Sequence, residues 1–309
     1  MIKKINSHDY DIIIGTHGII SDEIQYPALG MIIIDEEHRF GVEQREKLVS
    51  KASVDVHQIS MSATPIARTI TQAFYSSDVK ICELEVPSIR KPIKTTFIKD
   101  KRLLYKYILT MLSSGQQVYS VCPYVEENED ADNIISVEEL YREYQNAFQG
   151  KVKMGVVTGK MKQEEADQVI NDFKDRKYQL LIATTIIEVG VNVPNANLII
   201  INNPDRFGLA QLHQLRGRVG RGSDQGFCVM YVKADTPISD VSQRRMDIMC
   251  KTSNGFEIAE EDLKLRGGGY VLGTKQSGFD IYLDMIAKYP YIFNGVRKDI
   301  SRCVANTTL

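Results

Sequence analysis

Short apolar runs without polar alternation recur along the chain and constrain its fold more than any other feature. Met31–Ile34 and Leu198–Ile201 are examples, and neither is long enough for a membrane span. A strand with one face in water alternates apolar and polar residues, whereas a strand buried on both faces does not. The runs therefore predict an α/β chain with parallel strands that helices cover on both sides.

Three such runs lie near the start of the chain, and polar residues follow each of them. They are Asp11–His17, Met31–His38 and His57–Pro65, with a helix expected from there to about Phe74. Because the carboxyl ends of parallel strands meet at one edge of a sheet, these polar residues predict a ligand-facing edge. The segment 86–95, which carries two prolines and three basic residues, is typical of an interdomain linker.

A second α/β unit is predicted after the linker. Helical periodicity at Val137–Phe148 and Gln163–Lys174 separates its apolar runs, so repeated βαβ crossovers are the simplest interpretation. The expected strands are Thr96–Ile98, Gln117–Cys122, Val152–Val157, Gln179–Ala183, Asn197–Ile201 and Gly226–Val232.

The strand pattern stops at Lys233. Two helices are expected, one on each side of the turn at Asn254–Gly255. The second, Glu257–Gly269, is charged and ends at three glycines. Terminal helices are expected in residues 281–309. The predicted domains are therefore residues 1–92, 93–232 and 233–309.

Composition narrows the class of protein. The chain has 309 residues, 43% of them hydrophobic, and a formal net charge of -2. The net charge therefore does not indicate nucleic-acid binding, although a local basic patch could still bind nucleic acid. Its five cysteines have no zinc or redox spacing, and we expect each to be a small core side chain in a reducing compartment. Without a signal peptide or an apolar span, a cytoplasmic location with no membrane partner is expected.

The stretch Gln211–Arg221 concentrates positive charge. It holds three arginines, Arg216, Arg218 and Arg221, with two glycines among them. Guanidinium groups are permanent cations with forked donors that suit phosphates, and glycine lets the backbone approach such a ligand. The stretch predicts contacts to a nucleotide or to a nucleic acid backbone, with a solvated basic turn as the alternative.

Acidic and hydroxyl side chains follow several predicted strands. In Asp35–His38 one carboxylate can hold Mg2+ through water while its neighbour orients an attacking water. Ser62–Pro65 can couple such a site to a neighbouring domain or can cap the next helix. Ala183–Pro194, with paired threonines and a glycine turn, suits phosphodiester contacts, although a loop that satisfies its own backbone has the same composition.

The order of these motifs resembles that of the superfamily 2 helicases and translocases, in which two RecA-like domains clasp ATP. Within that superfamily the chain is most similar to the RecG family of branched-DNA helicases. The segments that carry the resemblance are Asp35–Arg45, Phe207–Gly222, Phe256–Gly267 and Leu272–Gly278. It implies part of a first RecA-like domain, a complete second one and a C-terminal helical extension.

The resemblance also implies roles for individual residues. Asp35 would bind Mg2+ and Glu36 would activate water, with His38 beside them. Gln214, Arg218 and Arg221 would approach ATP from the second domain, the arginines acting as fingers on the γ-phosphate. Further nucleotide contacts would come from Gly190 and Asn192. Contacts to DNA, or coupling to it, would come from Thr16, Ser62, Thr64, Gly159, Thr184, Thr185, Arg244 and Gln276.

The chain also departs from the family pattern. No G-x-x-x-x-G-K-[ST] phosphate loop occurs in the 309 residues, and the family's wedge domain is missing as well. We therefore expect a C-terminal piece of a longer protein that alone neither hydrolyses ATP usefully nor unwinds forks. Asn192 stands where the family usually has an acid, and Thr158 where a histidine is common before Gly159. The triple glycine with Tyr270 replaces a more usual proline and acid.

The expected cofactors of the full-length parent are ATP and Mg2+, and its expected partner is branched double-stranded DNA such as forks and Holliday junctions. We expect the parent to be monomeric and the present chain to be able to self-associate through an exposed sheet edge. Two alternatives stay open. One is the motor of a transcription-repair coupling factor, and the other is a non-catalytic DNA-binding module.

Overall fold

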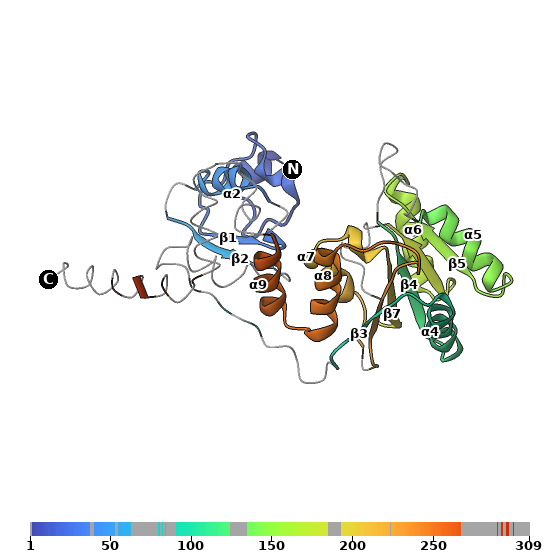
Figure 1. Ribbon diagram of the computed structural model, residues 1–309. Coiled ribbons are helices and arrows are strands. Elements are labelled where there is room, and N and C mark those ends of the chain that lie inside the picture. Colours follow the sequence, from blue (N-terminus) through green and yellow to red (C-terminus); the bar gives the residue numbers. More distant parts are fainter. Residues whose placement is uncertain are drawn as a thin grey trace. The chain divides into compact units, whose positions relative to one another are not determined.

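The computed structural model divides the chain into two compact units, Met1–Ala63 and Thr64–Leu309, which are described separately below. It describes residues 2–37, 40–52, 55–62, 80, 82, 84, 91–123, 135–184, 193–222, 224–266, 289, 292, 295, 296 and 299. Figure 1 shows the helices and strands of both units.

The first unit holds a small parallel sheet. Strand β1 (Met31–Ile34) pairs with β2 (His57–Ser60), with Met31 opposite His57 and Ile34 opposite Ser60. Two of the three strands predicted for this part of the chain are confirmed. The helical elements of the unit are α1 (Ile2–Asn6), the 3-10 helix η1 (His17–Ile20) and α2 (Val42–Val49).

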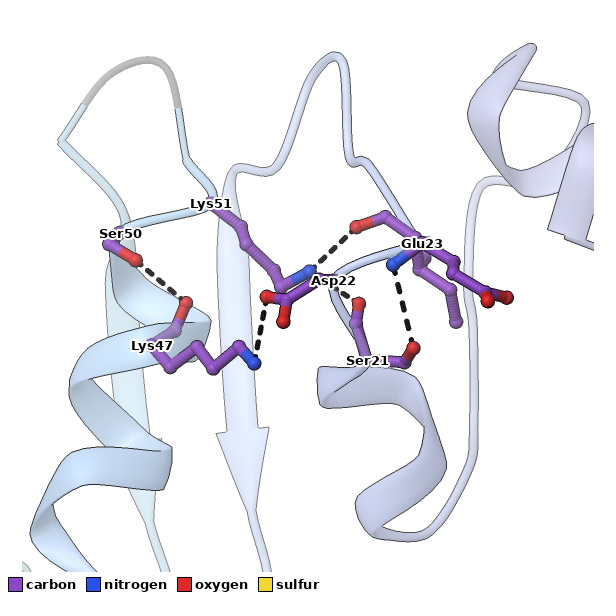
Figure 2. Close-up of polar contacts among 7 residues, drawn as sticks. Ser21, Asp22, Glu23, Lys47, Ser50 and Lys51 are labelled. Atoms are coloured by element: carbon purple, nitrogen blue, oxygen red, sulfur yellow. Dashed lines mark hydrogen bonds and ion pairs between the residues drawn. The ribbon is translucent and has the colours of Figure 1, made fainter.

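Lysines at the end of α2 fasten that helix to the loop after η1 (Figure 2). The Nζ of Lys51 donates to the carbonyl oxygens of Ser21 at 2.6 Å and of Ile24 at 2.7 Å. The Nζ of Lys47 lies 2.7 Å from Oδ1 of Asp22. These contacts tie two segments that lie far apart in the sequence of the first unit.

Burial in the first unit differs from the prediction. The run after Asp11 does not form a strand, and Ile14 is 91% exposed. Strand β1 buries Ile32 and Ile34 but leaves Ile33 60% exposed. The prediction of strands buried on both faces is therefore wrong here. In the described part of the first unit, β1 is covered on one face and open to water on the other, and all four residues of β2 are exposed.

The second unit contains a sheet of six parallel strands in the order β3-β8-β7-β4-β6-β5. All six predicted strands are confirmed. Their bounds are β3 Lys94–Ile98, β4 Gln117–Val121, β5 Met154–Val157, β6 Leu180–Ala183, β7 Ala196–Asn202 and β8 Phe227–Tyr231.

Two core clusters cover the two faces of this sheet. Alternate residues of β7 belong to different clusters, with Leu198 and Ile200 on one face and Ile199 and Ile201 on the other. Residues of α4 (Lys101–Ser113) and α5 (Val137–Ala147) contribute to the first face. The opposite face packs on α6 (Gln163–Lys174), α7 (Leu209–Arg216), α8 (Asp240–Lys251) and α9 (Gly255–Arg266). Burial on both faces is confirmed for this unit.

The helices begin at capping residues. The hydroxyl of Ser136 accepts from the N–H of Glu139, whose carboxylate accepts from the N–H of Ser136, and this reciprocal pair starts α5. The predicted turn between α8 and α9 is confirmed, since the side chain of Asn254 accepts from the N–H of Phe256 at 2.9 Å. None of the helices in the described ranges could cross a bilayer. Most of residues 267–309 lie outside the described residues.

The cysteines are less uniform than predicted. Cys122 and Cys228 are buried thiols, but Cys82 and Cys250 are exposed, so the expectation that each is a core side chain is wrong for these two. Cys303 lies outside the described residues. The apolar pattern around a cysteine does not fix which side of its element faces the core.

Candidate functional site

An acidic turn and a hydroxyl residue meet at the carboxyl edge of the first sheet. The N–H of Met61, after β2, donates to the carbonyl of Ile34 at 2.8 Å, and the N–H of Glu37 donates back to the carbonyl of Met61 at 3.1 Å. The parallel pairing thus brings Asp35 and Glu36 beside the segment that contains Ser62. His38 and Thr64 lie outside the described residues.

The backbone of the acidic turn is held in an unusual conformation. Glu36 has a φ of 51°, in the left-handed region that is uncommon for a residue other than glycine. The N–H of Glu36 donates to Oδ1 of Asp35 at 2.9 Å, which closes the turn. The guanidinium of Arg45, on α2, pairs with the carboxylate of Glu37. Glu37 is therefore engaged in fixing the turn, while Asp35 is exposed.

The residues present fit a magnesium ion that is coordinated mainly by phosphates and water, with few protein carboxylates. Mg2+ in nucleotide sites takes one or two protein carboxylates together with phosphates and water. Within the described ranges, no group of three or more His, Cys, Asp or Glu could hold a metal by itself. Asp35 is exposed and at a sheet edge, so it matches a single carboxylate ligand of this kind.

Thr16 lies close to the acidic turn through its neighbour His17. The imidazole of His17 stacks on the ring of Phe40 with centroids 4.4 Å apart. Phe40 follows the acidic turn, and its N–H donates to the carbonyl of Glu37 at 3.0 Å. Thr16 itself is exposed at the start of η1.

The arginine loop, defined here as residues 217–222, follows α7. Gly220 has a φ of +65° and turns the chain. Arg218 is buried, whereas Arg221 is exposed and its Nε donates to the carbonyl of Gly217 at 3.1 Å. Gln214, on α7, lies one turn before the loop.

Tyr119, in the six-stranded sheet, lies near both arginines of the loop. Burial raises the pKa of Tyr119 on β4, and the positive charges of Arg221 and Arg218 oppose that rise. The hydroxyl of Tyr119 is buried without a hydrogen-bond partner in the part of the chain that the structure describes. Val219, next to Arg218 in the loop, belongs to the same core cluster as Tyr119 and residues of α6 and α7, so the loop packs on that face of the sheet.

Arg216 has a different place from the other two arginines. Its guanidinium, 3% exposed, donates to the carbonyls of Met249 at 2.9 Å and Thr252 at 2.8 Å, at the end of α8. It also contacts Nδ1 of His213 at 3.1 Å. Burial lowers the pKa of Arg216, and burial followed by the Arg216 charge lowers the pKa of His213 to about 4. The phosphate-binding interpretation of this arginine is wrong.

The role of Arg216 was missed although the sequence contains a signal for it. Leu209, Leu212 and Leu215 repeat every three residues, and Arg216 is seven residues after Leu209. At 3.6 residues per turn, position 216 falls on the same face as position 209. Helical periodicity thus assigns Arg216 to the core and leaves Arg218 and Arg221, beyond the helix, for another purpose.

The other predicted DNA-contact residues are dispersed. Thr184, just after β6, is buried, and its hydroxyl has no hydrogen-bond partner among the described residues. Gly159 lies in the turn after β5, and Arg244 is exposed on α8. Besides His38 and Thr64, four predicted positions lie outside the described residues: Thr185 and Gln276, predicted for DNA, and Gly190 and Asn192, predicted for the nucleotide.

Three protein families match successive parts of the chain. Residues 1–73 match the DEAD/DEAH box helicase family, and residues 100–223 match the helicase conserved C-terminal domain. Residues 252–308 match the family described as ATP-dependent DNA helicase RecG, domain 3, C-terminal. The last match includes α9.

Individual relatives agree with the family matches. The chain is 46% identical over 302 residues to the ATP-dependent DNA helicase RecG of Streptococcus pneumoniae. The aligned region covers 94% of this chain and 43% of that protein. It is 42% identical over 313 residues to the RecG of Bacillus subtilis, covering 99% and 45% respectively. A solved structure of RecG bound to a three-way DNA junction superposes with a TM-score of 0.65 at 35% identity, over 90% of this chain and 36% of that one.

These matches and the two parallel sheets define a superfamily 2 helicase motor region: part of a first RecA-like domain, a second RecA-like domain and a helical extension. Within that class, the chain belongs to the RecG family. It spans less than half the length of the curated relatives that it matches. The predicted fold class and family are confirmed.

Proposed function

We propose that this chain is the part of an ATP-dependent motor on branched double-stranded DNA that carries the catalytic carboxylates and the arginine fingers. The observation that supports the proposal most strongly is its relationship to RecG along 94% of the chain, because that relationship includes both units and α9. In the full protein the motor would regress forks and migrate junctions in recombination and repair. The RecG relatives are from bacteria, whose DNA lies in the cytoplasm, and this supports a cytoplasmic location.

The proposed nucleotide chemistry uses two groups of residues. Bound Mg2+ would neutralise phosphate charge, and Asp35 is the carboxylate that would hold it, with Glu36 orienting water. His38 belongs to the same motif. Arg218 and Arg221 would stabilise charge on the γ-phosphate, with Gln214 positioned before them. Gly190 and Asn192 would add nucleotide contacts.

The proposed contacts to DNA lie in both units. Hydroxyls and backbone N–H groups at strand ends bind phosphodiesters without reading sequence. The residues proposed for this contact or for its coupling to ATP are Thr16, Ser62, Thr64, Gly159, Thr184, Thr185, Arg244 and Gln276.

Domain limits at 92/93 and 232/233 stay predictions.

Binding and turnover test the proposal together. A labelled three-way junction is titrated with the chain at several salt concentrations, and ATP turnover is measured in the same buffers. Because the 309 residues contain no G-x-x-x-x-G-K-[ST], we expect no turnover above the blank. We expect junction binding, with an affinity that falls linearly on a double logarithmic salt plot.

Three results would contradict parts of this proposal. Absence of binding at low salt would exclude a direct DNA role for the chain. Turnover that disappears in the Glu36→Gln variant would show that the chain hydrolyses ATP without that loop. A DNA affinity that Arg218→Lys, Arg221→Lys and added nucleotide all leave unchanged would favour the non-catalytic DNA-binding module.

A further inference from the structure

The arginine loop lies against the start of β8 with almost no space between the two backbones. A Cβ added to Gly226 would lie 2.8 Å from the Cα of Gly220, closer than any real contact of that kind. Gly220 also needs its left-handed φ of +65°. The loop therefore keeps its position only while both residues are glycine.

A third residue completes this contact from the side. The Cγ1 of Ile93 would lie 3.2 Å from a Cβ on Gly220 and 3.3 Å from a Cβ on Gly226. Ile93 is half-buried and packs on the core cluster that contains Leu215 and Val219, on either side of the loop's first residues. The Ile93 side chain thus occupies the space beside both glycines.

Hydrogen bonds on both sides of Ile93 hold it in register. The Nε2 of Gln225 donates to the carbonyl of Pro92 at 2.6 Å. The N–H of Lys94 donates to the carbonyl of Gly226 at 3.0 Å. The segment 92–94 is therefore fixed to residues 225–226, next to Gly220 of the arginine loop.

The same segment is the one through which the chain enters the six-stranded sheet. Pro92 and Ile93 belong to the second unit and come directly before the strand, which begins at Lys94. A displacement of this segment therefore changes the packing beside Gly220. Arg218 and Arg221 lie on either side of that glycine, so they move with it.

We propose that Ile93 is a positioning residue for Arg218 and Arg221, acting through its packing beside Gly220 and Gly226. The proposal rests on the proposed function, in which these arginines meet nucleotide phosphates. Ile93 touches no nucleotide itself. It acts by filling the space that fixes Gly220 and hence the direction of the two guanidiniums.

The test follows the side-chain Nε–Hε NMR signals of Arg218 and Arg221 in the full chain, first alone and then with Mg·ATP. Ile93→Ala is compared with Ile238→Ala, which removes the same atoms from a half-buried residue on the same core cluster. We expect similar melting temperatures for the two variants. Only Ile93→Ala should shift the arginine signals and weaken ATP binding, by roughly fivefold or more.

A second pair of variants separates positioning from stability. Gly226→Ala should lower the melting temperature and displace the arginine signals, because its Cβ meets the backbone of Gly220. Adding Ile93→Ala gives the loop room to shift, so the double variant should regain melting temperature without regaining the original arginine signals. Joint recovery of both quantities, or equal arginine signals in Ile93→Ala and Ile238→Ala, would overturn the proposal.

Failure of the proposed function gives a different result. If Arg221→Lys binds ATP like the unaltered chain, the finger role is wrong. The effect of Ile93→Ala on the nucleotide-free arginine signals would still report positioning of the loop. The two hypotheses therefore fail in separate measurements.

Discussion

Nearly the same apolar run occurs in both sheets of this chain, and the two sheets bury it differently. Strand β1 reads Met-Ile-Ile-Ile and β7 contains Leu-Ile-Ile-Ile, yet Ile33 is 60% exposed and its counterpart Ile200 is fully buried. Core clusters that include helix residues cover both faces of β7, whereas among the described residues β1 is covered on one face. An apolar run thus predicts a strand, but the elements that pack on the sheet decide how many faces are covered.

The largest expected effect comes from truncating the middle isoleucine of each run. Ile200→Ala leaves a cavity in a packed core and should cost about 2–5 kcal/mol of the free energy of unfolding of the second unit. Ile33→Ala removes atoms that are already in water and should cost at most about 1 kcal/mol in the first unit. Urea titrations followed by isoleucine methyl NMR report each unit separately, which is useful because the chain has no tryptophan.

The comparison breaks if the two substitutions cost the same. An equally large cost for Ile33→Ala would mean that the exposed face of β1 is covered in solution, as it would be by self-association. Diluting the sample then distinguishes the two cases, since an effect that depends on association falls with protein concentration.

The next largest effect concerns a cation that binds backbone carbonyls in each unit. Arg216 is buried and satisfies two carbonyls at the end of α8, while Lys51 does the same for Ser21 and Ile24 in a more exposed place. Arg216→Met should cost roughly 2–4 kcal/mol, because it leaves buried carbonyls without donors. Lys51→Met should cost only about 0.5–1.5 kcal/mol, because water replaces the lost donor.

The same methyl signals measure both cations, each in its own unit. A small cost for Arg216→Met, with unchanged signals from the residues around Met249, would show that another donor or water reaches the carbonyls of α8. Arg221→Met is the matched control in the second unit. Since Arg221 is exposed, its loss should leave the unfolding transition almost unchanged.

The sequence predicts the elements of the second unit well because their signals are local and agree with one another. Each apolar run in β4, β6 and β7 has strand neighbours on both sides, and α5 begins at a capping box that the sequence shows. The run at residues 11–14 has an equally apolar composition but forms no strand, since a strand also needs a partner for its N–H and C=O groups. The sequence of an apolar run does not show whether another strand will pair with it.

Prediction of the site divides in a similar way. The parallel direction of two strands predicts that Asp35 lies near the segment after β2. The structure shows this proximity. The three arginines look alike as a motif, but a helix face buries Arg216, whereas α7 ends at Arg216 and leaves Arg218 and Arg221 in the loop that follows. The contact of Ile93 with two glycines depends on atomic spacing between distant segments, which no local pattern contains.

The response to acid should also separate the two units. The pKa of His213 is about 4 in the fold and 6.5 ordinarily, because burial and Arg216 disfavour its charged form. Between these values the unfolded chain binds the proton and the folded chain does not, so stability rises with pH across this range. On acidification from pH 6.5 to 4 the second unit should lose up to about 3 kcal/mol, and His213→Gln should remove that slope.

The first unit should respond only at lower pH. The hydrogen bond from Lys47 and then its charge lower the pKa of Asp22 below the ordinary 3.8. A carboxyl with a lowered pKa contributes stability above its ordinary value, and that contribution is lost as pH falls through the folded value. Methyl signals of Ile34 should therefore stay native at a pH where those of Ile201 already show unfolding. An equal free energy of unfolding of the second unit at pH 6.5 and pH 4 would mean that the buried His213 does not control the acid stability of that unit.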